Sequence, residues 1–222
     1  MIITRARLDR SHGTSGSLAK VLMSGADNDR SHGLVWSLFN DGETETRRFL
    51  YRESEPGSFI VVSEQAPSDP QRLWTIDHKP YVVDVSKGDR LGFVLRANPV
   101  VTVPQPGKPR GLRADAIMNA KSGLEPTARS RFSAKDASAV AVVWLVKRSA
   151  ALGIEVDAAA TTADGYQQVR IPRTGHKPIV FSQIDFTGAL TVVDPEPLRQ
   201  ALFSGIGKAR AYGCGLLLVR RL

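Results

Sequence analysis

The sequence predicts an α+β protein with two β-α-β-β-α-β units in succession. Three observations support this prediction. Short runs of alternating apolar and polar residues are typical of strands, apolar residues recur at helical spacing behind N-cap residues, and Pro- and Gly-containing turns separate the runs. The order of elements is the same in both halves. With 222 residues, of which 42% are hydrophobic, the chain is long enough for two small domains.

The first unit is expected to span residues 1–86. Its four strands are predicted at residues 1–8, 47–53, 58–65 and 81–85. The first helix is predicted at residues 32–39, because four apolar side chains there share one helical face, and Asn28 or Asp29 is available as its N-cap. A short second helix is predicted at residues 68–74, where a proline falls in the first turn.

The second unit is expected to span residues 90–222, and an extra final strand is added to the same order of elements. Its strands are predicted at residues 90–103, 154–159, 166–171, 179–186, 189–193 and 216–219. Its strongest helix is predicted at residues 133–152, which begin with a capping-box pattern of Ser133 and Asp136. A further helix begins at the N-cap Asp194, which a proline follows.

Two such units are two ferredoxin-like folds, the architecture that RRM domains also use. In each of them, two helices cover one face of a four-stranded antiparallel sheet. This fold carries many unrelated functions, so the function has to be argued from particular residues.

Composition favours an anionic partner and excludes several other classes. The net charge of +8 and the pI of about 9.9 make nucleic acid the first candidate. The single cysteine, Cys214, excludes an internal disulfide and suits a reducing cytoplasm. The four histidines are widely scattered, so no metal site is expected. No apolar run approaches the roughly 18 residues of a membrane span, and no signal peptide is expected.

The most distinctive motif is the C-terminal stretch from Gly205 to Leu222. It begins with a glycine-studded basic loop that contains Lys208 and Arg210, and it continues as a short apolar run. Backbone amides in such a loop can form a concave anion site. The alternative is a glycine-rich turn between a helix and the last strand, with solvated basic residues. The sequence leaves both interpretations open, because the loop lacks the spacing of a P-loop or a dinucleotide fingerprint.

Three segments together resemble the Cas6e family, also called CasE or Cse3. They are residues 90–99 (RLGFVLRANP), residues 32–39 (HGLVWSLF) and the tail GIGKARAYGCGLL. The resemblance extends from the first strand to the last residues, with a poor match over about residues 103–131. It implies a CRISPR RNA-processing endoribonuclease of type I-E systems, which is cytoplasmic, needs no cofactor and joins the other subunits of the Cascade complex.

The resemblance also implies a chemistry. Family members bind the stem-loop of CRISPR repeat RNA and cut at its 3′ base. The 2′-hydroxyl of the preceding nucleotide attacks the scissile phosphate, which leaves a 2′,3′-cyclic phosphate and a 5′-hydroxyl. Such a reaction needs a base, an acid and cations near the phosphate, but no metal. Two alternatives stay open: a non-catalytic RNA-binding subunit of a CRISPR ribonucleoprotein, and a small-molecule enzyme that uses the glycine loop as an anion site.

His32 is the predicted catalytic residue, because the family's histidine lies at the entrance of the first helix. An ordinary imidazole pKa of about 6.5 suits either proton role, although a helix-start histidine with a local hydrogen bond is the alternative. His12 lies in the same tetrapeptide, Arg-Ser-His-Gly, but lacks the apolar stripe that follows His32. Several members of the family that the chain resembles carry a tyrosine three residues before the histidine, where this chain has Asp29. The role of the tyrosine cannot be transferred to Asp29. Asp29 and Ser31 are expected to assist catalysis, with a helix cap as the alternative for Asp29, and Arg30 is expected to contact RNA.

RNA binding is expected to involve several basic segments. They are the region before the first helix, the strand after residue 90, the loop at residues 104–113, the hairpin around residue 175, and the glycine loop. Phosphate contacts from such residues dominate affinity and make it dependent on salt. A solvated turn is the alternative for the hairpin. The candidates are Arg30, Arg96, Lys108, Arg110, Arg113, Arg170, Arg173, His176, Lys177, Lys208 and Arg210.

Overall fold

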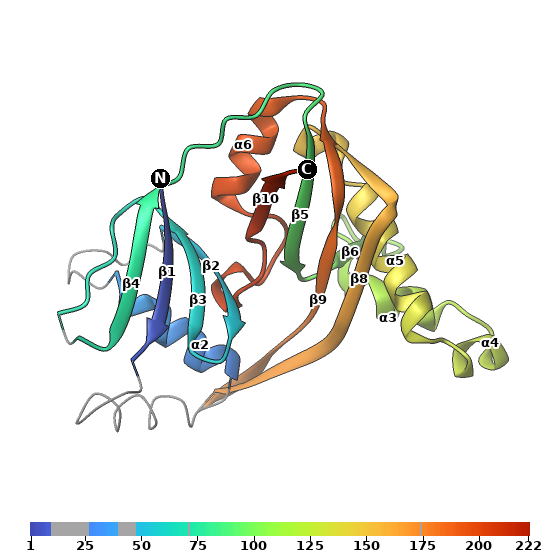
Figure 1. Ribbon diagram of the computed structural model, residues 1–222. Helices are drawn as coiled ribbons and strands as arrows, with labels where there is room; N and C mark the ends of the chain where they lie inside the picture. Colours follow the sequence, from blue (N-terminus) through green and yellow to red (C-terminus); the bar gives the residue numbers. More distant parts are fainter. Residues whose placement is uncertain (10–26, 40–47, 71, 174) are drawn as a thin grey trace.

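The computed structural model describes residues 1–9, 27–39, 48–70, 72–173 and 175–222 (Figure 1). It contains two four-stranded antiparallel sheets. The strands of the first are β1 (Ile2–Leu8), β2 (Phe49–Glu55), β3 (Ser58–Ser63) and β4 (Trp74–Pro80), in the order β2-β3-β1-β4. The strands of the second are β5 (Arg90–Ala97), β8 (Ile154–Arg173), β9 (His176–Val192) and β10 (Leu217–Arg221), in the order β10-β5-β9-β8.

Both sheets follow the ferredoxin-like order, in which the fourth and third strands of a unit flank its first strand. Helix α2 (Asp27–Trp36) follows β1, α5 (Ala134–Val146) precedes β8, and α6 (Pro195–Ser204) follows β9. The predicted α+β fold with two ferredoxin-like units is therefore confirmed. The division into residues 1–86 and 90–222 stays a proposal, which the irregular connection between β4 and β5 supports.

The first sheet buries one face under α2, and the second sheet buries one face under its helices. In the first unit, Leu34 and Val35 of α2 pack against Tyr51, Phe59 and Val61 of the sheet. The larger core of the second unit is formed in the same way, by Phe93, Leu95, Trp144, Leu145, Phe186, Leu198 and Leu202. A smaller apolar cluster joins the two units, in which Leu50 and Val62 pack near Leu216 and Leu218.

The first helix begins earlier than the sequence predicted. It spans Asp27–Trp36 instead of residues 32–39, so Asn28 and Asp29 lie inside it and are not its N-caps. The apolar residues Leu38 and Phe39 continue as a turn, since their amides donate to carbonyls only three residues back. His32 consequently lies in the middle of the helix and not at its entrance.

The predicted second helix of the first unit, at residues 68–74, is wrong. The carboxylate of Asp69 instead accepts hydrogen bonds from the amides of Leu73 and Trp74, at 2.9 and 2.8 Å. A short polar side chain that bonds to nearby amides competes with helix formation in this way. The last strand of the unit, β4, begins directly after this turn. It occupies residues 74–80 and not the predicted residues 81–85.

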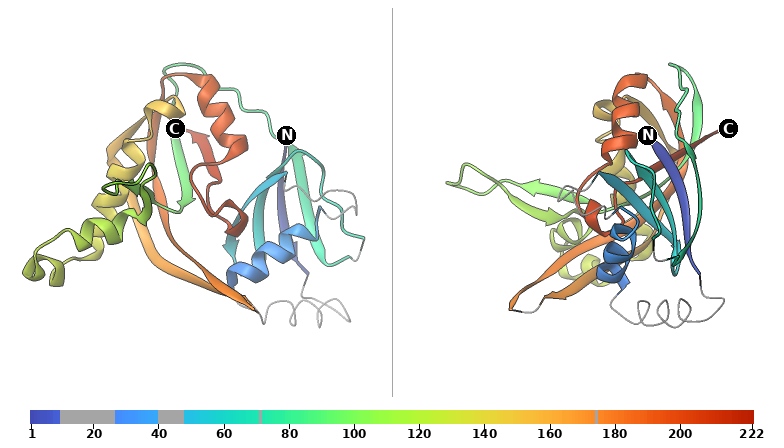
Figure 2. Two further views of the ribbon diagram at one scale, coloured as in Figure 1. Left: turned by 180° about the vertical axis from the view of Figure 1, so that it is seen from behind. Right: turned by 90° about the vertical axis from the view of Figure 1, so that its left-hand side faces the viewer.

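The four separate strands predicted between residues 154 and 193 are two long strands, β8 and β9. Their pairing shifts register at three places, so the polar breaks in the sequence are bulges within one hairpin. Gly188 permits one of these irregularities, because a Cβ there would lie 2.3 Å from the hydroxyl of Thr161. The hairpin therefore extends far beyond the sheet, toward α2 (Figures 1 and 2).

The strand predicted at residues 90–103 is broken at Asn98-Pro99, because proline cannot donate to the ladder. Its second part, β6 (Val100–Val103), pairs with β7 (Leu112–Asp115), so the predicted basic loop is the tip of a small hairpin. Two short helices follow, α3 (Ala116–Ser122) and α4 (Pro126–Ser130). The helix predicted at residues 133–152 ends at Val146, and its capping box is present as predicted.

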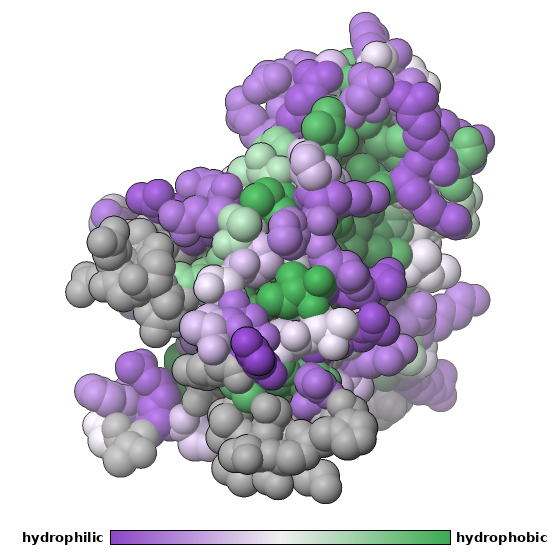
Figure 3. Space-filling view, turned by 60° about the vertical axis from the view of Figure 1, so that its left-hand side comes forward, coloured by the Kyte–Doolittle hydropathy of each residue, from purple (hydrophilic) through white to green (hydrophobic). Residues whose placement is uncertain are grey.

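The surface in Figure 3 is mostly hydrophilic and carries only small apolar patches. Among the described residues, no helix has the length and apolar character that crossing a membrane requires.

Candidate active site

A single carboxylate on β2 fixes helix α2 to the first sheet. The side chain of Glu53 accepts a hydrogen bond from the hydroxyl of Ser31, and its other oxygen lies 3.5 Å from Arg30 Nη2. The same oxygen accepts the amide of Gly57 at 2.8 Å, in the turn after β2. Helix, strand and turn are therefore joined at one point.

These contacts bear on the roles expected for two residues. Ser31 is 3% exposed, and the Arg30 side chain is 9% exposed and paired with Glu53. Both side chains are held by Glu53 and only slightly exposed, so the RNA contact of Arg30 and the catalytic role of Ser31 stay untested predictions. Asp29 lies in the first turn of α2, and its side chain is outside the described part of the structure.

His32 follows these two residues and contacts other partners. Its half-buried ring lies 5.8 Å, centroid to centroid, from the ring of Trp36 one turn further along α2. A second ring, that of Tyr212 in the glycine-rich loop, also lies at 5.8 Å. Nδ1 of His32 is buried and has no hydrogen-bond partner among the residues that the structure describes. His12 lies outside the described residues.

Strand β2 explains why the histidine and the glycine-rich loop meet. Tyr51 lies two residues before Glu53, on the same face of the strand. Its hydroxyl donates to the carbonyl of Ala211 at 3.0 Å, in the short 3-10 helix η2 (Arg210–Tyr212). Gly213 allows the close approach, since it has a φ of +79° and a Cβ there would lie 3.3 Å from the Tyr51 ring. One strand face thus holds both α2 and η2.

The glycine-rich loop is a packed turn and not an open cradle. Arg210 donates to the carbonyl of Gly207 at 3.1 Å and to the carbonyl of Ser204, at the C-terminal end of α6. This side chain therefore stabilises the loop, and its RNA contact stays an untested prediction. A Cβ at Gly205 would lie 3.0 Å from Leu50 of the first sheet, so the loop follows that sheet closely. Lys208 is exposed.

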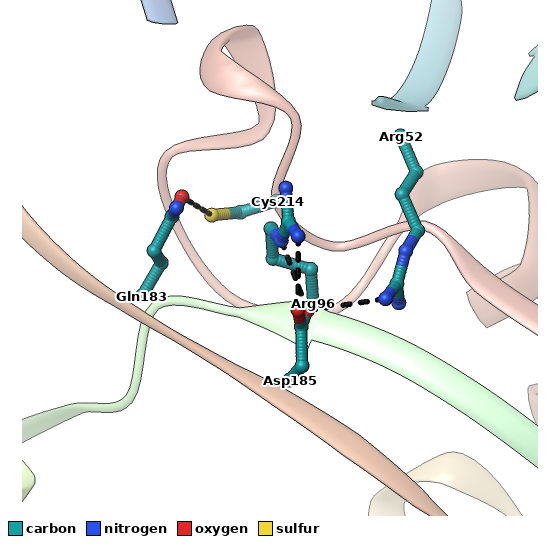
Figure 4. Close-up of polar contacts among 5 residues, drawn as sticks. All are labelled: Arg52, Arg96, Gln183, Asp185 and Cys214. Atoms are coloured by element: carbon teal, nitrogen blue, oxygen red, sulfur yellow. Dashed lines mark hydrogen bonds and ion pairs between the residues drawn. The ribbon is translucent and has the colours of Figure 1, made fainter. Parts of the chain in front are cut away.

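Arg96 is also engaged inside the protein (Figure 4). Its Nε and Nη2 each donate to the carboxylate of Asp185 at 2.9 Å, and Arg52 of the first sheet lies 3.3 Å from the same carboxylate. The hydrogen bond to Asp185 raises the pKa of Arg96, whereas burial lowers the pKa of Arg52. This cluster joins the two sheets, and the RNA contact expected of Arg96 stays an untested prediction for a side chain that Asp185 already binds.

Cys214 lies beside that cluster, with its sulfur 4.0 Å from the side-chain oxygen of Gln183. Burial raises the pKa of the Cys214 thiol to about 12, so the thiol is neutral at physiological pH. It therefore acts as a small apolar side chain. Among the described residues, no group of three or more His, Cys, Asp or Glu side chains could hold a metal ion.

Exposed basic side chains gather on the long β8–β9 hairpin. Arg170, Arg173, His176 and Lys177 are all exposed. Strand β8 contacts α2, which carries His32. Apolar side chains of the same hairpin, including Phe181, pack in one cluster with Cys214 and Tyr212, so the hairpin is fixed against the glycine-rich loop.

The second expected basic segment lies elsewhere. Lys108, Arg110 and Arg113 are exposed on the β6–β7 hairpin, which projects away from α2 (Figure 2). The structure therefore brings His32, the glycine-rich loop and the β8–β9 hairpin together, but not this segment. Sequence reasoning missed Glu53 and Tyr212. The position of Tyr212 between closely spaced glycines was the only signal for it.

Three comparisons relate the chain to known proteins. A family model described as "CRISPR associated protein" matches residues 1–221. The chain is 28% identical over 211 residues to the CRISPR system Cascade subunit CasE of Escherichia coli (strain K12), with 90% of this chain and 96% of that protein covered.

Solved structures share the fold. Thermus thermophilus Cse3, bound to an RNA that represents a pre-cleavage complex, superimposes with a TM-score of 0.66 at 23% identity, over 99% of this chain and 98% of that chain. The CRISPR-associated protein Cas6e from E. coli K-12 superimposes with a TM-score of 0.58 at 19% identity, over 100% of both chains. The tandem ferredoxin-like architecture is thus common to all three.

Proposed function

This chain belongs to the CRISPR associated protein family, and from that premise we propose that it is a Cas6e-type endoribonuclease. It binds the stem-loop of CRISPR repeat RNA and cuts at the 3′ base of the stem to make crRNA. The single observation that carries the proposal is the position of His32. It lies half-buried on α2, beside Tyr212 of the glycine-rich loop, and the basic β8–β9 hairpin contacts the same helix.

The reaction is an internal transesterification. The 2′-hydroxyl of the nucleotide before the cut attacks the phosphorus, and the bond from phosphorus to the 5′-oxygen breaks. One proton leaves the 2′-oxygen and one reaches the departing 5′-oxygen, so the products are a 2′,3′-cyclic phosphate and a 5′-hydroxyl. In this proposal, Nε2 of His32 carries one of these two proton transfers. The reaction uses no metal ion and no cofactor.

RNA binding falls to the exposed cations. Arg170, Arg173, His176 and Lys177 on the β8–β9 hairpin are proposed to contact the phosphates of the stem, because a duplex is recognised mainly through its shape and backbone. Lys208 is proposed as the phosphate contact of the glycine-rich loop. The CasE relative is a Cascade subunit, and we propose that this chain also joins such a complex, in the cytoplasm.

A second candidate function is a non-catalytic RNA-binding subunit. Asp29 stands where the resemblance to the family implies a tyrosine, three residues before the histidine, and this departure favours the second candidate. Both candidates require the same RNA and the same basic hairpin, so only the chemistry distinguishes them.

The experiment is cleavage of the chain's own CRISPR repeat RNA in EDTA. The proposed function predicts a product with a 2′,3′-cyclic phosphate, and no product when the nucleotide before the cut carries a 2′-deoxyribose. His32→Ala should abolish cleavage while it keeps RNA binding, whereas His12→Ala and His78→Ala should cleave normally. Tight binding without any cleavage by the unaltered protein would support the second candidate, and an active His32→Ala would reject His32.

A further inference from the structure

The ring of Tyr212 contacts the imidazole of His32 from the other half of the chain. The two centroids are 5.8 Å apart and the ring planes are inclined by 47°. Trp36 contacts the same imidazole at 5.8 Å and 43°, from the next turn of α2. His32 is therefore held between one aromatic ring of its own helix and one of the glycine-rich loop.

Tyr212 is itself firmly placed. Its ring stacks on Phe181 of β9, at 5.4 Å between centroids and 26° between planes. Its amide donates to the carbonyl of Ala209 at 2.9 Å, in a turn where Ala209 takes the left-handed conformation with a φ of +56°. The hydrogen bond from Tyr51 to Ala211 fixes the residue before it. A non-glycine residue in that conformation is uncommon and indicates that the surrounding packing determines the turn.

His32 depends on these aromatic contacts for its orientation, because its ring lacks a described hydrogen bond on Nδ1. A histidine that transfers protons is commonly oriented by a hydrogen bond on its second nitrogen. Nδ1 of His32 is buried and without a partner among the described residues, so no described hydrogen bond holds the ring at a fixed rotation. The aromatic contacts are what remains to restrict it.

We propose that Tyr212 is a positioning residue, whose ring fixes the orientation of the His32 imidazole and thereby directs Nε2 at the RNA. The contribution of this residue to cleavage rests on the proposed function. The ring contact itself can be tested without RNA. The proposal commits to the ring of Tyr212 and not to its hydroxyl, so Phe and Leu substitutions separate the two.

The test compares Tyr212→Phe, Tyr212→Leu and the control Tyr81→Leu, which removes another ring contact, with Phe203 of α6. Single-turnover cleavage is measured at saturating protein, and affinity is measured with a repeat RNA that has a 2′-deoxyribose before the cut. A misplaced catalytic group costs up to about 100-fold in rate, so Tyr212→Leu should lower the rate roughly 10- to 100-fold with little change in affinity. Tyr212→Phe and Tyr81→Leu should keep the rate.

A second readout uses the RNA-free protein with isotopically labelled histidine. The ring-proton signals of His32, assigned by their loss in His32→Ala, should shift in Tyr212→Leu and stay nearly in place in Tyr212→Phe and Tyr81→Leu. If Tyr212→Leu does not fold, Phe181→Leu, which removes the ring behind Tyr212, should give a smaller shift and rate loss in the same direction.

Several results would overturn the proposal. Unchanged His32 signals and an unchanged rate in Tyr212→Leu, or in Phe181→Leu where that variant replaces it, would show that the contact does not position the imidazole. A loss in Tyr212→Phe as large as that in Tyr212→Leu would assign the effect to the hydroxyl. Normal cleavage by His32→Ala would instead reject the proposed catalytic histidine, while the ring-proton signals would still decide whether Tyr212 holds it.

Discussion

Replacing Asp185 with asparagine should weaken the connection between the two sheets. Asp185 accepts two hydrogen bonds of 2.9 Å from Arg96 and lies 3.3 Å from Arg52. Asparagine keeps the volume and one acceptor, but it leaves two guanidinium groups close together without the carboxylate that they share. The side chains of Arg52, Arg96 and Asp185 are only 18%, 24% and 34% exposed, so water compensates in part.

The magnitude follows from these contacts. Removing one partner of a fully buried ion pair costs about 3–5 kcal/mol, and a hydrogen bond to a charged group contributes about 1.5–3 kcal/mol. Because a fifth to a third of each Asp185-cluster side chain is exposed, we discount the upper value and expect a loss of about 2–3 kcal/mol in the free energy of unfolding.

The assay is urea unfolding followed by tryptophan fluorescence, with Asp157→Asn as the matched control. Asp157 pairs with Arg90 at 3.1 Å in the same sheet, but these side chains are 37% and 64% exposed. An exposed pair contributes at most about 1 kcal/mol. The reasoning is refuted if Asp185→Asn costs no more than Asp157→Asn, or if 0.5 M NaCl removes the difference between them.

Three further predictions concern the glycine-rich loop, its cysteine and the basic hairpin. Tyr51→Phe removes the hydrogen bond to Ala211 and should lower the free energy of unfolding by about 1 kcal/mol in urea; an unchanged midpoint would contradict this role. The pKa of Cys214 is raised from an ordinary 9.0 to about 12. The unfolded chain therefore loses this proton first, and stability should fall as pH rises through that window, by up to about 1.4 kcal/mol per pH unit. Cys214→Ala should lose this component between pH 8 and 10.5; an identical pH dependence would disprove it. Arg173→Gln should reduce the salt dependence of RNA binding by about one unit of slope, whereas Arg7→Gln, on the first sheet, should leave the slope unchanged. Equal effects would indicate unspecific charge.

Local sequence patterns were sufficient for the fold class. The alternation of β1, the capping box of Ser133 and Asp136 and the N-cap Asp194 are all present where they were predicted. Each of these signals acts within a few residues, so the sequence contains all of the relevant information. The predicted helix at residues 68–74 failed for a related reason, because the Asp69 carboxylate favoured a turn over the helix that its neighbours allowed.

The sequence by itself determined the two ferredoxin-like units and the overall basic charge, and the resemblance that it carries to the Cas6e family led to the proposal of His32 among the four histidines. Only the tertiary structure decided which basic side chains are exposed and which residues surround the His32 imidazole. Arg96 and Asp185 are 89 residues apart in the chain, and Tyr51 and Ala211 are 160 apart. Whether an arginine binds RNA or a carboxylate of its own protein depends on such long-range pairs, because an ion pair needs its two groups within about 4 Å and the fold determines which charges come that close.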